Sequence, residues 1–324
     1  MVKAILRLIR WPNLLMVPLT MYLVRYCVIA PMLNCQYSLQ LGTEVSLQLS
    51  DGYFLILVLI NMLLGAGGYI INDYFDCRID NINRPADVIV GRLISRRIAI
   101  TLHIVTSAAA VVLAAILSMH LHMLSLLLIY ITFGGIFWLY STTYKRQFLI
   151  GNIVVAALTA SVPLQVGIID YICLMRTYGF DIMVKGLSLM PIIYWTLGFA
   201  GFAFIISMIR EIIKDMEDLE GDRAYGCNTL PISFGMQVSK IVVVSLIGIT
   251  IAAIYVVYSI FLHEPLTLIY ITAFIVIPLV AAAIMTAIAS QLKHYHHISI
   301  LLKMIMLTGI LYTLIVWQIM EFVI

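Results

Sequence analysis

Charged side chains are scarce in this sequence. Only 11% of its 324 residues are Asp, Glu, Lys or Arg, whereas a soluble domain carries about 25%. Hydrophobic residues make up 63% of the chain, and its mean hydropathy is +1.07. This composition excludes a soluble globular protein and predicts an all-α, polytopic membrane protein. The net charge of +3 is modest, and we expect membrane lipids, not nucleic acid, around the chain.

The sequence also lacks paired cysteines and long polar linkers. It has five cysteines, an odd number, and none forms a C-x-x-C pair. A disulfide framework or a zinc site is therefore not indicated. No low-complexity segment interrupts the chain, so we expect a single transmembrane domain over residues 1–324.

Long apolar runs recur along the chain at about the 20-residue length that spans a bilayer. The sequence predicts nine membrane helices, at about residues 12–33, 53–73, 98–118, 123–142, 148–169, 187–209, 240–262, 266–290 and 300–322. Residues 34–52 and 170–186 are expected to be loops on one face of the membrane. The first run exceeds the length of a signal-peptide core, so we interpret it as a membrane helix.

The basic residues lie unevenly about these predicted helices. Of the 19 Lys and Arg residues, Arg25 lies within the first helix, and only Arg176 and Lys185 fall on the face of the two loops named above. The others gather at the opposite face, which includes the N-terminus. Because basic loops stay in the cytoplasm, the N-terminus is predicted to be cytoplasmic.

Acidic residues are concentrated at the end of the second apolar run. Asp73, Asp76 and Asp80 stand at i, i+3 and i+7, with Asn72 four residues before Asp76. If the helix continues, the three carboxylates share one face. A simple acidic cap does not explain them, because the C-terminal end of a helix disfavours negative charge. Oxygen ligands in this arrangement favour Mg²⁺.

A second triad of carboxylates has the same spacing. Asp215, Asp218 and Asp222 follow the sixth apolar run, also at i, i+3 and i+7. A solvated charged helix is the alternative for this segment taken alone. Both triads fall on the predicted cytoplasmic face, so we expect the active site there.

Two carboxylate clusters with nearby bases suit a polyanion bridged by Mg²⁺, and diphosphate is the natural candidate. The candidate bases are Lys145, Arg146, Arg210 and Lys214, each of which also fits an ordinary interfacial residue. Asn13 and Arg84 are further substrate-binding candidates. Asn13 equally suits a helix entry beside Pro12, and Arg84 equally suits a turn.

These residues resemble the UbiA superfamily of intramembrane prenyltransferases. The resemblance covers nearly the whole chain and is carried by Asn72-x3-Asp76-x3-Asp80, by Asp218-x3-Asp222 with Lys214-Asp215 before it, by Tyr140-Ser141-x2-Tyr144-Lys145-Arg146 and by Arg10-Trp11-Pro12-Asn13. It implies an all-α bundle of nine transmembrane helices around a central cavity, in which Mg²⁺ joins both motifs to a prenyl diphosphate. Ionisation of the substrate would give an allylic carbocation that an acceptor attacks.

The resemblance also implies roles for individual residues. Metal and diphosphate positions would be Asn72, Asp76, Asp80, Asp218 and Asp222, with Asp73 and Asp215 assisting and Lys145 and Lys214 holding the diphosphate. The four aspartates Asp76, Asp80, Asp218 and Asp222 are the catalytic candidates.

The segment from Arg210 to Pro231 is most similar to the geranylgeranylglyceryl phosphate branch of the family, which makes ether-lipid precursors. Residues 86–91, Ala-Asp-Val-Ile-Val-Gly, depart from the Ile-Pro-x-Gly run of many other members. Two alternatives stay open: an aromatic-acceptor prenyltransferase of quinone biosynthesis, and a cation or metabolite transporter. A transporter is expected to place ionisable groups near mid-membrane, whereas here they gather at one face.

Overall fold

The computed structural model describes residues 2–322, and within them helices account for nearly all regular structure. Nine stretches in this part of the chain are long and apolar enough to cross a membrane, which confirms the predicted number. Their bounds are Trp11–Leu41, Asp51–Asn83, Arg96–His120, Leu124–Thr142, Ile150–Val184, Met190–Glu217, Leu230–Leu262, Pro265–Ile288 and Leu292–Glu321.

Several helices extend further than the apolar runs that predict them. The second continues through the acidic motif to Asn83, so the condition for placing its carboxylates on one face is met. The loop predictions for residues 34–52 and 170–186 were wrong in large part. Helical turns continue to Leu41, and the fifth span continues to Val184. Hydropathy marks where a helix leaves hydrocarbon, but the backbone hydrogen bonds of a helix continue into polar sequence where no Gly or Pro stops them.

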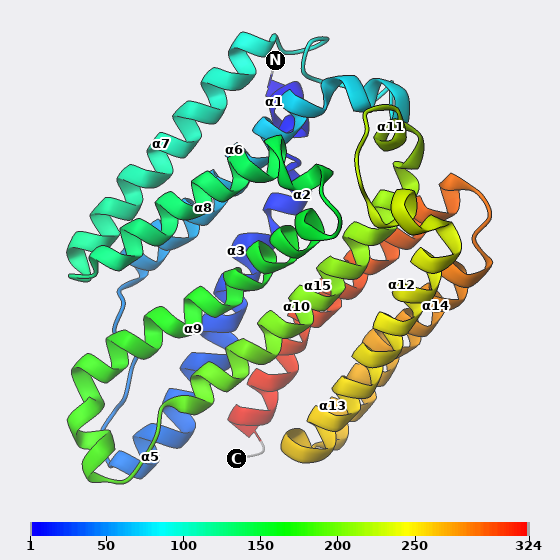
Figure 1. The fold of residues 1–324 in the computed structure, drawn as a ribbon. Helices are drawn as coiled ribbons and strands as arrows, with labels where there is room; N and C mark the ends of the chain where they lie inside the picture. The colour runs from blue at the N-terminus through cyan, green and yellow to red at the C-terminus, as the bar shows by residue number, and fades with distance from the viewer. Residues whose placement is uncertain (1, 323–324) are drawn as a thin grey trace. The chain divides into compact units, whose positions relative to one another are not determined.

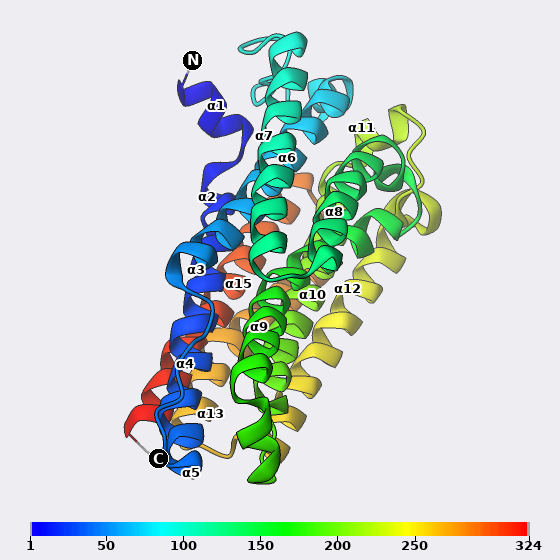
Figure 2. The same cartoon turned by 90° about the vertical axis from the view of Figure 1, so that its left-hand side faces the viewer.

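The described chain divides into two compact units. The first contains the residues up to Pro18, Ser50–Val154 and Asp218–Ser233. Its elements are α1 (Val2–Leu8), α2 (Trp11–Leu14), α6 (Asp51–Asn83), α7 (Arg96–His120), α8 (Leu124–Thr142), the 3₁₀ turn η3 (Tyr144–Arg146) and α11 (Leu219–Ala224). Within this unit α7 and α8 pack along α6 (Figure 1), and α1 and α2 follow one another beside α6 (Figure 2).

The second unit contains Leu19–Leu49, Val155–Glu217 and the chain from Phe234 onward. Its elements are most of α3 (Met16–Val24), η1 (Arg25–Ile29), α4 (Ala30–Met32), η2 (Leu33–Tyr37), α5 (Ser38–Leu41), most of α9 (Ile150–Val184), α10 (Met190–Glu217), most of α12 (Leu230–Val257), η4 (Tyr258–Leu262), α13 (Pro265–Ile271), η5 (Thr272–Val276), α14 (Ile277–Ile288) and α15 (Leu292–Phe322). Here α15 packs beside α10 and α14 (Figure 1). A single domain over the whole chain stays a prediction.

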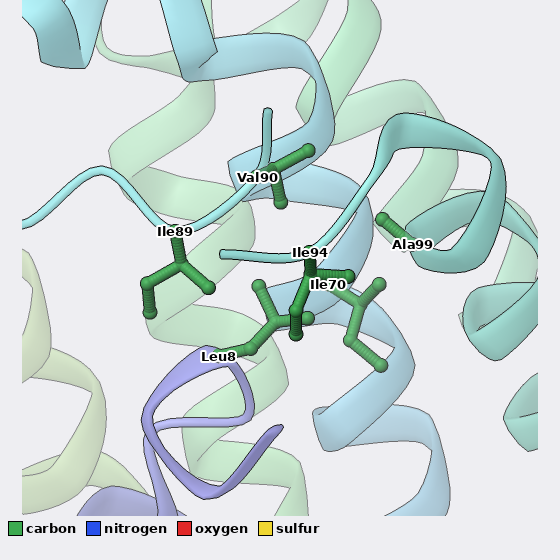
Figure 3. Close-up of a cluster of buried hydrophobic side chains, with 6 residues drawn as sticks. All are labelled: Leu8, Ile70, Ile89, Val90, Ile94 and Ala99. Carbon is green, nitrogen blue, oxygen red and sulfur yellow. The ribbon is translucent and has the colours of Figure 1, made fainter. Parts of the chain in front are cut away.

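A cluster of buried hydrophobic side chains packs the loop that follows α6 against neighbouring helices. Figure 3 shows side chains of α1, α6, α7 and this loop converging. The cluster is Leu8, Ile70, Ile89, Val90, Ile94 and Ala99. The loop turns at Gly91, whose φ of 88° is one that a side chain disfavours. Full burial stabilises an aliphatic side chain by about 1.5–3 kcal/mol, so this cluster holds the loop against the end of α6.

Candidate functional site

The first acidic motif lies on the last three turns of α6. The helix is unbroken there, so Asp73, Asp76 and Asp80 lie along one face. Because the C-terminal end of a helix disfavours negative charge, these carboxylates need positive partners. Arg10 supplies one, since its Nη2 lies 2.9 Å from Asp73 Oδ1. Lys145 supplies another by pairing with the buried Asp76.

Lys145 comes from η3, the short turn between α8 and α9. Burial lowers the pKa of Lys145, but the charge and hydrogen bond of Asp76, together with Tyr140 and Asp80, raise it further and hold the pKa well above its usual range. The ammonium therefore stays protonated. The turn is tied to the second motif's segment by the backbone, because Asn228 N–H donates to Arg146 C=O at 2.9 Å. Arg146 itself is exposed.

The part of the second motif that belongs to the first unit, Asp218 to Asp222, meets the end of α6. Asp218 stands just before α11, and Arg84 Nη2 donates to Asp218 Oδ1 at 2.9 Å across 134 residues of sequence. The carboxamide of Asn83 bridges to the same segment, accepting from Gly221 N–H at 2.7 Å and donating to Asp218 C=O at 3.1 Å. The two motifs therefore lie together at one end of this unit.

The pKa of Asp222 depends on charged groups of both motifs. Its side chain is buried, and burial raises its pKa to about 6. Lys145 lowers this pKa, while Asp218, Asp76 and Asp80 raise it. Such couplings fall off with distance, so the carboxylates of α6 and of α11 share one electrostatic environment around the Lys145 ammonium.

The remaining predicted residues lie elsewhere. Asn13 is half-buried in α2, where its N–H donates to Arg10 C=O at 2.8 Å as part of the helix entry. Arg210, Lys214 and Asp215 lie on α10 in the second unit. There Arg210 and Lys214 both bind the buried Glu211, at 3.1 and 2.6 Å.

Sequence reasoning did not assign a site role to Arg10, Asn83, Glu211 or Gly221. Arg10 and Asn83 each had a signal, because Arg10 begins the Arg-Trp-Pro-Asn run and Asn83 continues the face of Asp76 and Asp80 at i+7 and i+3. Gly221 had none, since its role depends on which side chain packs against it.

The donor set fits a magnesium–diphosphate site. Its polar ligands are carboxylate and amide oxygens, which Mg²⁺ prefers. Asn72 Oδ1 is buried and has no hydrogen-bond partner, so this oxygen is available as a ligand. Over residues 2–322, no three His, Cys, Asp or Glu side chains come close enough to hold a metal by themselves. That is expected of Mg²⁺, which takes only one or two carboxylates and completes its shell with waters and substrate phosphates.

Comparison with known proteins shows which family this chain resembles. The model of the UbiA prenyltransferase family matches residues 29–317. A digeranylgeranylglyceryl phosphate synthase of Thermococcus gammatolerans is 37% identical over 203 residues, which are 61% of this chain. The match spans 63% of that relative's length.

Two solved structures share the fold. One is of digeranylgeranylglyceryl phosphate synthase, with a TM-score of 0.60 and 22% identity over 97% of this chain and 98% of that one. The other is a UbiA homologue from Archaeoglobus fulgidus bound to DMAPP and Mg²⁺, with a TM-score of 0.52 and 16% identity over 96% of this chain and 98% of that one. With the family model matching most of its length, this chain belongs to the UbiA prenyltransferase family and is an integral, multi-pass membrane protein.

Proposed function

We propose that this protein is an Mg²⁺-dependent prenyltransferase that moves a polyprenyl group, geranylgeranyl in the form we favour, from its diphosphate to an acceptor. The observation that carries the proposal is the meeting of the two aspartate motifs at one end of the first unit. Family membership and the ligands of the Archaeoglobus fulgidus homologue, DMAPP and Mg²⁺, support it.

The aspartates and Asn72 would hold the metal–diphosphate group. Bound Mg²⁺ would neutralise the diphosphate and make it a better leaving group. Asn72, Asp76, Asp80, Asp218 and Asp222 are the proposed ligand positions, assisted by Asp73 and Asp215. The proposed diphosphate and substrate contacts are Asn13, Arg84, Lys145, Arg146, Arg210 and Lys214.

The ion pairs of the site suggest an exchange of partners. Lys145 pairs with Asp76, and Arg84 pairs with Asp218. With Mg²⁺ held by Asp76 and Asp218, Lys145 and Arg84 would be released and would bind the diphosphate oxygens. Arg84 suits this role because a guanidinium binds phosphate through two parallel hydrogen bonds. Before ligand binds, the two carboxylates and the two bases neutralise one another. Afterwards the carboxylates would neutralise the cation and the bases would neutralise the diphosphate.

The reaction breaks the allylic C–O bond, and its electron pair leaves with the diphosphate. An acceptor oxygen then forms a new bond to the allylic carbon and loses its proton. We propose geranylgeranylglyceryl phosphate as the acceptor, on the strength of the Thermococcus gammatolerans relative and of the Arg210–Pro231 segment. An aromatic acceptor is the alternative.

A direct assay tests the function and the acceptor together. Purified protein is incubated with labelled geranylgeranyl diphosphate, Mg²⁺ and each candidate acceptor in turn. Label moving to geranylgeranylglyceryl phosphate, lost with EDTA and restored by Mg²⁺, is the expected result. Transfer only to an aromatic acid would overturn the acceptor, and turnover in EDTA would overturn the metal dependence.

We further propose that the N-terminus and the active site face the cytoplasm. The support is the charge asymmetry, because Lys and Arg gather at the face that holds both motifs. Single cysteines placed in the segments 42–50 and 143–149, in a cysteine-free background, would report the orientation in sealed cells. Labelling by an impermeant maleimide is expected only at 42–50, and the reverse pattern would contradict the orientation.

A further inference from the structure

Asp218 occupies the position before the first residue of α11, where an Asp side chain normally caps the helix. Such a cap accepts from the N–H of the second or third helical residue. The Asp218 side chain makes no capping bond here. Its carboxylate instead accepts from Arg84 at 2.9 Å.

The cap of α11 comes from another helix. Gly221 is the third residue of α11, and its N–H donates to Asn83 Oδ1 at 2.7 Å. The other end of the same carboxamide, Asn83 Nδ2, donates to Asp218 C=O at 3.1 Å. One side chain at the end of α6 thus satisfies an otherwise orphaned donor and fixes the carbonyl of the residue that would normally act as the cap.

Gly221 is what lets Asn83 approach so closely. A Cβ built on Gly221 would lie 2.5 Å from both Asn83 Nδ2 and Oδ1, and 2.6 Å from its Cγ. No side chain fits in that space unless Asn83 moves. Asn83 and Gly221 are therefore a matched pair.

We propose that Asn83 is a positioning residue, which caps α11 in place of Asp218 and so keeps the Asp218 carboxylate available for ligand. Together with Gly221 it forms a clasp that sets the second motif against Asp76 and Asp80. The inference rests on the proposed function, since it assigns how one of the proposed ligands is presented. Without the clasp, the Asp218 carboxylate would cap its own helix and turn away from Arg84.

Ligand-induced stabilisation tests the positioning role without relying on turnover. The melting temperature of the full-length protein is measured against Mg²⁺ at a fixed concentration of an unreactive thiolo analogue of geranylgeranyl diphosphate. Asn83→Ala is expected to raise the Mg²⁺ concentration for half-maximal stabilisation by about tenfold or more, the range seen when a residue supporting a metal ligand is lost. Asn81→Ala is the matched control, because Asn81 is an exposed residue of α6 whose amide donates to Cys77 C=O of its own helix and accepts from the exposed Arg92, not from α11.

A mutant cycle tests the contact itself. Gly221→Ala alone is expected to lower the melting temperature of the ligand-free protein, because its methyl group collides with Asn83. In the Asn83→Ala background the same change is expected to cost nothing, since the space is vacated and Ala favours helix. Gly52→Ala, on a helical glycine with open space around it, should behave alike in both backgrounds.

The outcomes distinguish a failure of the proposed Asn83–Gly221 clasp from a failure of the proposed function. Additive effects in the cycle, or an unchanged Mg²⁺ half-saturation in Asn83→Ala, would overturn the clasp. Failure of the wild-type protein to be stabilised by the analogue would contradict the proposed function, while the cycle still judges the contact. If Asn83→Ala does not fold, Asn83→Ser is assayed with the same expectation, because its hydroxyl is too short to bridge both backbone groups.

Discussion

One ion pair of the second unit contrasts with two ion pairs of the first. In the second unit, Arg25 Nε lies 3.3 Å from Asp170 Oδ2, and the two side chains are 0% and 2% exposed. In the first unit, Lys145–Asp76 and Arg84–Asp218 keep one or both partners open, with Lys145 29% and Arg84 37% exposed. A sealed pair exchanges partners only by breaking the bundle, whereas an open pair is ready to exchange with a ligand. The difference separates a structural pair from a binding site.

The largest expected effect follows from removing an acid of the open pairs. Asp76→Ala should lower turnover by at least about 10²–10³-fold, the scale of losing one group that stabilises transition-state charge. The protein should still fold, because the released Lys145 reaches water. Turnover with labelled geranylgeranyl diphosphate and the melting temperature together measure this. Full turnover in Asp76→Ala would remove it from the site.

The sealed pair should give the reverse result. Asp170→Ala leaves the Arg25 charge buried without its acid, which costs about 3–5 kcal/mol of stability in comparable cases. The protein that remains folded should keep the KM for prenyl diphosphate, because the Asp170 carboxylate pairs with Arg25 and its side chain is only 2% exposed. A changed KM with an unchanged melting temperature would contradict the structural role of this pair.

Removing a base from the open pairs should have an intermediate effect. Lys145→Ala loses a charge-assisted bond to diphosphate worth about 1.5–3 kcal/mol, or roughly 10–100-fold in binding. The KM for the diphosphate substrate is expected to rise accordingly in steady-state kinetics. An unchanged KM and kcat would exclude Lys145 from the site.

The pH dependence of metal binding is a milder test. Burial raises the pKa of Asp222 to about 6, so its carboxyl group is protonated below that pH. A divalent ion must then displace the proton, so the apparent Mg²⁺ affinity should fall by up to about tenfold per pH unit below 6 and level off above it. Mg²⁺ titrations between pH 5 and 8 measure this. An affinity that is flat across the range would argue against Asp222 as a ligand.

The smallest effect is expected at the protein surface. Arg7 pairs with Asp87 at 3.2 Å, but the two side chains are 47% and 70% exposed. Such pairs contribute less than about 1 kcal/mol. Arg7→Ala should leave the melting temperature nearly unchanged and serves as the background for the other variants. A large drop would mean that this pair holds α1 against the loop after α6.

Much of the fold and part of the candidate site could be predicted from the sequence, because composition and spacing are local properties. The nine spans follow from apolar length, and the shared face of Asp73, Asp76 and Asp80 follows from helical period. The pairing of Arg25 with Asp170 could not be predicted. Hydropathy placed Asp170 in a loop, since a carboxylate ends an apolar run, whereas the helix continues and the distant Arg25 neutralises it.

The geometry of the second motif also could not be predicted from the sequence. Asp215, Asp218 and Asp222 have the i, i+3, i+7 spacing of the first motif, but no single helix carries them, because α10 ends at Glu217 and α11 starts at Leu219. Asp218 therefore stands at a break, and its orientation depends on Asn83 and Arg84 of α6. Partners so far apart in sequence are fixed only by tertiary packing.

The central claim is that the two aspartate motifs hold one metal–diphosphate group. Its most direct test is a crystal structure with Mn²⁺ and the thiolo analogue of geranylgeranyl diphosphate, in which anomalous scattering locates the metal. The account predicts metal density at about 2.0–2.3 Å from carboxylate oxygens of both α6 and the Asp218–Asp222 segment, with the diphosphate between them. Metal on one motif alone, with the diphosphate elsewhere, would contradict it.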